Sequence, residues 1–148
     1  MAHSVGDEMH PSWSTPPFEQ LRVPHSLHAA SDRSRGRGGV AHILIATTEA
    51  NVGKIGRITT AGVYTEFTLP SGSNSLPIQI NAGPDGNVWW VEANTSNIGR
   101  ITPAGVITEF PTPTAASNPN GIVAASDGDM YATEVVSSKI ARFNPSKP

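Results

Sequence analysis

The stretch KIGRITTAGVYTEF, residues 54–67, decides the fold, because the chain repeats it. Residues 97–110 read NIGRITPAGVITEF and are identical at 11 of the 14 positions. A third copy begins with IAR at Ile140, so that Ile55, Ile98 and Ile140 recur at spacings of 43 and 42 residues. A period of about 40–45 residues is typical of architectures in which each unit packs on the next.

Each repeat contains four short apolar runs that turn residues separate. In the second copy the runs are PIQINAG, NVWWVEA, NIGRIT and VITEFPT, and the turns are PDG, NTS and PAG. Glycine supplies the positive φ that tight hairpins require, so these turns favour antiparallel strands. Four antiparallel strands in every period predict the blade of a β-propeller.

The extent of the repeat predicts an all-β fold, a partial β-propeller of about two and a half four-stranded blades that is open within one chain. We expect the blades at about residues 40–69, 77–112 and 119–143, within a domain spanning residues 40–148. The third blade ends after its third strand. Exposed blade edges of this kind favour self-association.

The N-terminal stretch, residues 1–39, has neither the 2.0-residue nor the 3.6-residue period and is rich in Pro, His, Arg and Ser. It predicts a disordered or non-homologous arm. The alternative is that it adds one strand, or docks through Trp13 and Phe18. The abrupt change to a clean repeat motivates the hypothesis that residues 1–45 come from a shifted reading frame or a misassigned start.

Composition excludes several classes of function. The charged fraction is 15% and the formal net charge is −2, which argues against nucleic acid and anionic membranes as partners. The chain has no cysteine, so disulfides and cysteine-ligated zinc are excluded. A signal peptide and a membrane-spanning run are both missing from the sequence, and we expect a cytoplasmic protein. His25 and His28 lack the partner ligands of a metal site.

Three glutamates follow equivalent apolar runs, and each lies eight residues before an arginine. The pairs are Glu49 with Arg57, Glu92 with Arg100, and Glu134 with Arg142. Adjacent antiparallel strands would bring such residues together on one face, which predicts a structural ion pair in each blade. The alternative is that the glutamates converge near the propeller axis and hold a cation.

The combination of PDGNVWWVE with IGRITPAGVITEF resembles the repeat of the virginiamycin B lyase family, also called streptogramin lyases. The resemblance covers the chain from about Val40 to Pro145. It implies a seven-bladed propeller and a magnesium-dependent elimination that opens the ester of type B streptogramin antibiotics, which are cyclic depsipeptides. The resemblance thus implies a carbon–oxygen lyase that confers antibiotic resistance.

The residues that the resemblance assigns to catalysis are mostly missing. The family's functional histidine follows the proline that opens a blade, where this chain has Ile78 and Asn120. The resemblance therefore assigns no catalytic residue here, and it offers only Glu92 and Glu134 as ligands of Mg²⁺. From this departure we expect a lyase-like fragment that is not catalytically competent alone.

Two alternatives to a lyase remain open on sequence. The consensus is also similar to NHL and SMP-30-like propeller proteins, which present loops to small molecules and other ligands, and the polar loops at residues 71–76 and 112–119 suit that role. The other alternative is purely structural, in which the blades complete a propeller with another chain.

Overall fold

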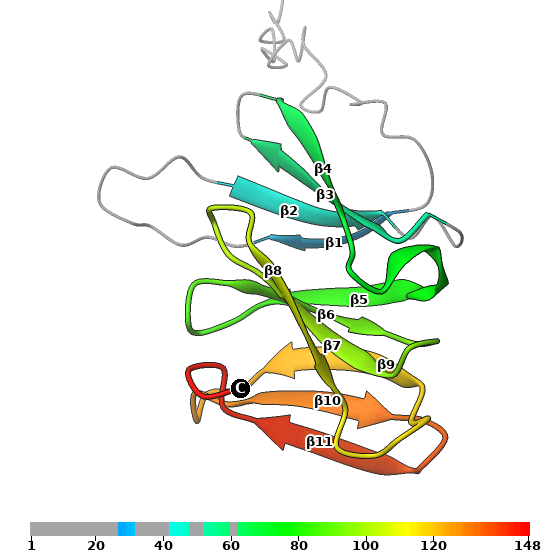
Figure 1. Ribbon diagram of the computed structural model, residues 1–148. Coiled ribbons are helices and arrows are strands. Elements are labelled where there is room, and N and C mark those ends of the chain that lie inside the picture. Colours follow the sequence, from blue (N-terminus) through cyan, green and yellow to red (C-terminus); the bar gives the residue numbers. More distant parts are fainter. Residues whose placement is uncertain (1–26, 32–41, 48–51, 60–61) are drawn as a thin grey trace, which may run out of the picture.

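The computed structural model describes residues 27–31, 42–47, 52–59 and 62–148, the first two ranges by their backbone alone. Within these ranges it contains three antiparallel sheets stacked one on another, as Figure 1 shows, and the only helix is a single short 3₁₀ turn. The all-β partial propeller predicted from the repeat is confirmed. No helix among the described residues is long and apolar enough to cross a membrane.

Each sheet is built from consecutive strands in sequence order. The first sheet contains β1 (Leu27–Ser31), β2 (His42–Thr47), β3 (Lys54–Thr59) and β4 (Tyr64–Thr68). The second contains β5 (Pro77–Ala82), β6 (Val88–Glu92), β7 (Asn97–Ile101) and β8 (Ile107–Pro111), and η1 (Gly72–Asn74) precedes it. The third contains β9 (Pro119–Ala124), β10 (Met130–Glu134) and β11 (Lys139–Phe143).

Strand β1 lies inside residues 1–39, so Leu27–Ser31 agrees with the alternative that this stretch adds one strand. It pairs antiparallel with β2, with Leu27 opposite Thr47 and Ser31 opposite Ile43. The physical reason is that β2 would otherwise present an unpaired edge, which a short strand of small residues can cover. The first sheet therefore has four strands. Residues 1–26 and 32–41 lie outside the described part of the chain.

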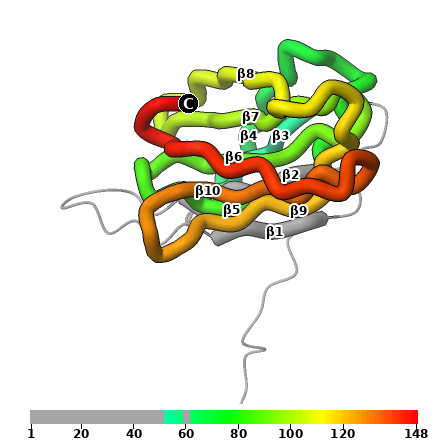
Figure 2. Tube along the Cα trace, turned by 90° about the horizontal axis from the view of Figure 1, so that it is seen from below, coloured from blue at the N-terminus to red at the C-terminus, as the bar shows by residue number. Residues whose placement is uncertain are grey.

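The sheets pack through two apolar layers. The first layer joins Ile55 and Leu69 to Ile80, Val88, Trp90 and Ile101, and the second joins Trp89, Val91 and Ile98 to Ile122, Met130, Ala132 and Ala141. Alternation along each strand sends successive side chains to opposite faces, so the second sheet supplies both layers. Figure 2 shows β5 and β9 side by side at one edge of the stack and β8 at the other.

The residue before each blade-opening proline takes an unusual backbone conformation. Leu76 has φ of 48° and Asn118 has φ of 49°, both in the left-handed region. Their carbonyl oxygens accept hydrogen bonds from the amides of Ala93 (3.1 Å) and Val135 (3.3 Å). The first bond ties the connection between β4 and β5 to the turn after β6, and the second ties the connection between β8 and β9 to the turn after β10.

Candidate functional site

The two glutamates proposed as metal ligands end their strands in buried positions. Glu92 is the last residue of β6 and Glu134 is the last residue of β10, and their exposed fractions are 0% and 1%. Ionised carboxylates are rarely buried without partners, so the hydrogen bonds of these two side chains decide their role.

The Glu92 carboxylate is surrounded by donors from its own sheet. It accepts hydrogen bonds from Trp90 Nε1 (3.0 Å), Thr95 Oγ1 (2.7 Å) and Asn97 Nδ2 (3.5 Å). Burial raises the pKa of Glu92 above its ordinary value, although the bonds from Thr95 and Trp90 oppose this shift. Glu109, through its charge and a hydrogen bond, raises the pKa of Glu92 further.

Glu109 connects this cluster to the loop that leaves the first sheet. Its carboxylate accepts hydrogen bonds from the Ser71 amide (3.1 Å) and the Ser71 hydroxyl (2.5 Å). Ser71 Oγ in turn accepts a bond from Asn97 Nδ2 at 3.0 Å. Glu109 therefore fastens the loop between β4 and β5 onto the second sheet, and Asn97 links Ser71 of that loop to Glu92.

Glu134 has the same place in its repeat but a different environment. It accepts hydrogen bonds from the Thr114 amide (3.3 Å), in the connection between β8 and β9, and from Ser137 Oγ (3.1 Å). Burial opposes ionisation of Glu134, but the bonds from Thr114 and Ser137 outweigh it and hold its pKa below the ordinary value. Glu134 thus fixes the connection between the second and third sheets, whereas Glu92 is bonded within its own sheet.

Glu92 and Glu134 do not fit a magnesium site in this arrangement. Mg²⁺ requires ionised or carbonyl oxygens in a near-octahedral shell and retains several waters, whereas both carboxylates are buried and bonded to protein donors. The described residues also contain no group of three His, Asp or Glu side chains placed to hold a metal ion. Magnesium stays a prediction that rests on the family resemblance.

The predicted ion pairs between these glutamates and the arginines are wrong for the second and third sheets. The register places Arg100 opposite Trp89 and Glu92 opposite Asn97, and it places Arg142 opposite Tyr131. Residues eight apart face each other only if the turn between them is centred on Ser96, but the pairing of Glu92 with Asn97 centres this turn between Asn94 and Thr95. A pair with Glu49 cannot be assessed, because Glu49 lies outside the described residues.

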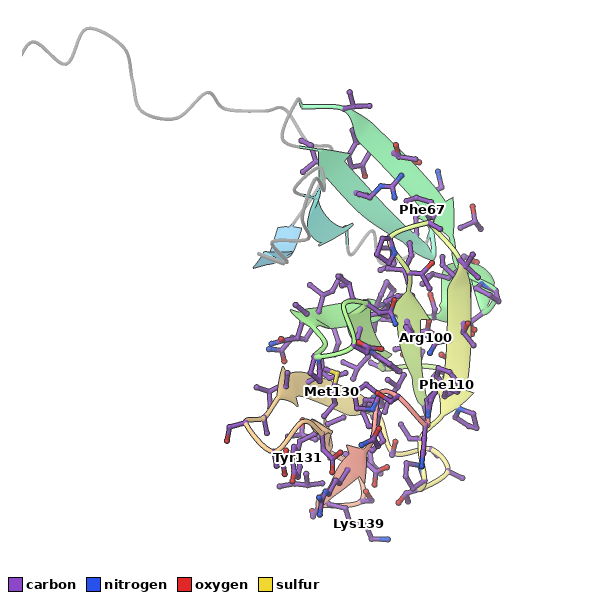
Figure 3. The ribbon with its side chains drawn as sticks, turned by 90° about the vertical axis from the view of Figure 1, so that its left-hand side faces the viewer. Phe67, Arg100, Phe110, Met130, Tyr131 and Lys139 are labelled. Atoms are coloured by element: carbon purple, nitrogen blue, oxygen red, sulfur yellow. The ribbon has the colours of Figure 1, made fainter. Side chains whose placement is uncertain are left out.

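The arginines instead stack on aromatic rings. The guanidinium carbon of Arg57 lies 5.0 Å from the centre of the Phe67 ring, and that of Arg100 lies 5.5 Å from both Trp89 and Phe110. Figure 3 shows Arg100 and Phe110 together on the second sheet. Arg57 Nη1 also donates to the carbonyl of Pro103 at 2.8 Å, which joins the first sheet to the second. These roles are structural.

Arg142 is the arginine that does form ion pairs, with aspartates of the third sheet. Its Nη2 lies 2.6 Å from Asp129 and 3.9 Å from Asp127. A hydrogen bond from Tyr131 is the first cause that lowers the pKa of Asp127, and the charge of Arg142 lowers it further. The sequence signal for this pairing was Asp129, the last residue of SDGD, because the second repeat has Asn87 at the equivalent position of PDGN.

The hollow between the second and third sheets is small. It encloses about 100 Å³ and is lined by apolar side chains that include Trp89, Ile98, Phe110 and Phe143. Drug-sized ligands occupy pockets of roughly 300–1,000 Å³. This hollow is therefore too small for a cyclic depsipeptide.

One sequence signal upstream of the repeat was missed. Residues 24–32 read PHSLHAASD and residues 119–127 read PNGIVAASD, identical at five of nine positions. This places His25 directly after a proline that matches Pro119, the setting in which the resemblance expects a functional histidine. His25 lies outside the described residues. The longer connection after residue 31 hid the match, because it breaks the period of 42 or 43 residues.

Comparison with known proteins identifies the repeat. The model of the virginiamycin B lyase family matches residues 40–147. A search of curated protein sequences finds no match. A structure of streptogramin B lyase is 30% identical, with a TM-score of 0.67, over 86% of this chain and 41% of that chain.

Two further solved structures extend the comparison. A catalytically inactive variant of virginiamycin B lyase from Staphylococcus aureus, solved with quinupristin, is 32% identical, with a TM-score of 0.70, over 88% of this chain and 42% of that chain. A protein of unknown function from Bacteroides caccae is 16% identical, with a TM-score of 0.50 over 85% of this chain and 49% of that chain, and it shows the fold alone.

The chain spans about two fifths of the length of the lyase structures it matches.

Proposed function

The chain belongs to the virginiamycin B lyase family, and from this membership we propose that it supplies blades of a streptogramin-lyase propeller without forming a complete lyase site alone. The observation that carries the proposal is the state of Glu92 and Glu134. Both side chains are buried and bonded to protein donors, so neither is free to hold a catalytic ion. The competing role as an NHL-like or SMP-30-like module gains no support from the family match.

The family reaction defines what a complete site must contain. A base removes a proton next to a carbonyl, the ester carbon–oxygen bond breaks, and no water is consumed. A bound magnesium ion would polarise the carbonyl oxygen. The residues after the described blade-opening prolines are Ile78 and Asn120, and neither side chain can accept this proton. His25 is the one histidine that sequence matching places after such a proline.

The test is incubation of the purified chain with quinupristin and magnesium, followed by chromatography and mass spectrometry. Elimination gives a linear product of unchanged mass, whereas hydrolysis adds the mass of one water, so the two reactions are distinguishable. We expect no linear product above the protein-free control. Linearisation that requires magnesium and stops with a chelator would overturn the proposal.

Two matched variants interpret a positive result. If linearisation occurs, His25→Ala should abolish it and His3→Ala should leave it unchanged, because only His25 follows a blade-opening proline. Loss in the first variant alone would establish a lyase site built around His25. A role in antibiotic resistance depends on the same measurement.

A further inference from the structure

The third sheet has three strands among the described residues, whereas each of the other two sheets has four. Its edge strand β11 pairs with β10 on one side, and Figure 1 shows it as the last strand at the lower end of the stack. The equivalent strands β3 and β7 each pair with a further strand on their outer side, β4 and β8 respectively. The outer edge of β11 therefore offers its backbone donors and acceptors to a fourth strand.

The fourth strands of the first two sheets present the same three residues to their neighbours. In the first sheet the triplet Thr-Glu-Phe, residues 65–67, lies antiparallel and opposite residues 55–57. In the second sheet the same triplet, residues 108–110, lies opposite residues 98–100. The equivalent residues of β11 are 140–142. The register of the repeat therefore places a Thr-Glu-Phe segment beside this part of β11.

The phenylalanine of the triplet lies against the arginine of the neighbouring strand. The guanidinium carbon of Arg100 is 5.5 Å from the ring centres of both Trp89 and Phe110. Arg142 has one such ring in the part of the chain that the structure describes, Tyr131 at 5.9 Å. Tyr131 corresponds to Trp89 in the repeat, so the ring that β11 lacks is the one from a fourth strand.

The isoleucine of β11 is exposed where its counterparts are buried. Ile140 is 68% exposed, whereas Ile55 and Ile98 are 0% and 4% exposed. Each of the buried isoleucines lies in an apolar layer on which a fourth-strand phenylalanine packs, Phe67 in one and Phe110 in the other. A phenylalanine placed opposite Ile140 would cover apolar surface that water now contacts, which favours binding.

The charge of β11 complements the glutamate of the triplet. In the first sheet Lys54 Nζ lies 2.5 Å from the Glu66 carboxylate. Lys139 has the position of Lys54 in the repeat, and Figure 3 shows it at the outer end of the third sheet. Its charge lowers the pKa of Glu134, but its ammonium group forms no ion pair with the described carboxylates. A glutamate on an added strand therefore meets an available cation.

We propose that the outer edge of β11 binds an extended segment of another protein that carries Thr-Glu-Phe and lies antiparallel to β11. The phenylalanine packs on Ile140 and Arg142, and the glutamate pairs with Lys139. Strand addition gains affinity from main-chain hydrogen bonds and specificity from alternate side chains. A second copy of the chain is a poorer source, because both of its triplets already pair within their own sheets. The interaction does not depend on lyase activity.

The first test uses a fluorescein-labelled peptide of sequence GVITEFPT, which copies residues 105–112. Fluorescence anisotropy during titration with the full chain should show saturable binding, whereas a peptide with the same residues in scrambled order should not bind. Alanine in place of the peptide phenylalanine should weaken binding by about tenfold or more, because it removes the apolar contact. Absence of saturable binding, or equal binding of the scrambled peptide, would overturn the proposal.

The second test locates the peptide on the chain. Ile140→Glu should weaken binding of the peptide by about tenfold or more. Val123→Glu is the matched control, because Val123 is 52% exposed on the same sheet but lies on β9 at the opposite edge. It should leave binding unchanged. Equal loss in the two variants would show that the peptide does not sit on β11. Circular dichroism checks that each variant keeps its strand content.

A charge exchange tests the contact of the glutamate with Lys139. Lys139→Glu should weaken binding of the peptide. A peptide with lysine in place of its glutamate should bind this variant more tightly than it binds the unaltered chain. The same order of affinities for both peptides on both proteins would contradict the predicted register.

Light scattering distinguishes a second copy as the occupant of the edge. If a second copy held the edge, the unaltered chain would have twice the mass of 15.5 kDa and Ile140→Glu would reduce it to one chain. That result would overturn the proposal. We expect Ile140→Glu to leave the mass of the chain in solution unchanged, because the edge of β11 is not an interface between copies.

Discussion

At the scale of single residues, one tryptophan and one glycine define the packing of the second sheet. An ideal Cβ built on Gly99 would lie 2.0 Å from the Trp90 indole ring. In the third sheet the equivalent residues are Ala132 and Ala141, which face each other in register. In the second sheet a large tryptophan side chain lies over a glycine that has no side chain, whereas in the third sheet two small alanine side chains face each other.

Gly99→Ala should therefore destabilise the fold. The added methyl group meets a rigid ring, and overpacking of this kind costs typically about 1–3 kcal/mol in the free energy of unfolding. Urea denaturation measures the change. Gly86→Ala is the control, because its Cβ meets nothing within 4 Å and it is strained only by a φ of 77°. An effect of Gly99→Ala no larger than that of the control would contradict the packing explanation.

The contrast between Glu92 and Glu134 predicts opposite effects of pH on stability. A carboxyl whose pKa is raised in the folded state binds its proton more tightly than in the unfolded state. The contribution of Glu92 to the free energy of unfolding is therefore fully present below the ordinary pKa of a glutamate. It is lost as the pH rises through the raised pKa of Glu92. Glu92→Gln cannot ionise, so this loss should disappear when unfolding is measured between about pH 4 and pH 8.

Glu134→Gln is the companion variant with the opposite sign. The pKa of Glu134 is lowered in the folded state, so Glu134 stabilises the fold at pH values above the ordinary pKa of a glutamate. This stabilisation is lost as the pH falls through the lowered pKa. Glu134→Gln should therefore destabilise the chain at neutral pH, where Glu92→Gln should not. The same pH slope in both variants would show that the two environments are not distinct.

At the scale of elements, strand β1 decides whether the first sheet has three or four strands. Adjacent residues of an antiparallel strand alternate in their hydrogen bonding, so one of Ala29→Pro and Ala30→Pro must remove a bond to β2. We expect that variant to lower the free energy of unfolding by about 1 kcal/mol or more relative to the other.

The control for this pair is Ala29→Val, which keeps the backbone donor and suits a strand. It should leave stability nearly unchanged. If both proline variants were as stable as the valine variant, β1 would not contribute to the folded sheet. Denaturation in urea provides the comparison.

Elements were predicted from sequence where a short-range signal exists. The pattern of apolar runs and glycine turns in residues 77–112 gave all four strands of the second sheet, because strand period and turn chemistry act locally. Strand β1 was predicted only as an alternative and was not assigned to a blade, because the connection from Ser31 to His42 is twice as long as its counterpart from Ala124 to Met130.

The candidate site was harder to predict than the fold. The position of Glu92 at the end of a strand could be read from VWWVE, but its partners could not. They come from the turn at Thr95 and Asn97 and from Glu109 on another strand, and the register depends on where that turn is centred. Side-chain pairing across strands is set by such details of the turn.

At the scale of the whole molecule, the second sheet differs from the other two. It has a sheet of this chain on both faces, whereas the first and third sheets each have one such neighbour among the described residues. In stacked repeats, stability is approximately the sum of each unit and its contacts with adjacent units. The second sheet is thus the most stabilised of the three described sheets.

The two apolar layers have a consequence for how such chains change over evolutionary time. Each layer joins the front of one repeat to the rear of the next with the same kinds of residue, among them Ile55 and Ile98 on the front and Ile80 and Ile122 on the rear. An in-frame duplication or deletion of one whole repeat therefore creates a junction that the sequence already encodes. Gene segments of this type can change their number of units in a single genetic event, without compensating substitutions.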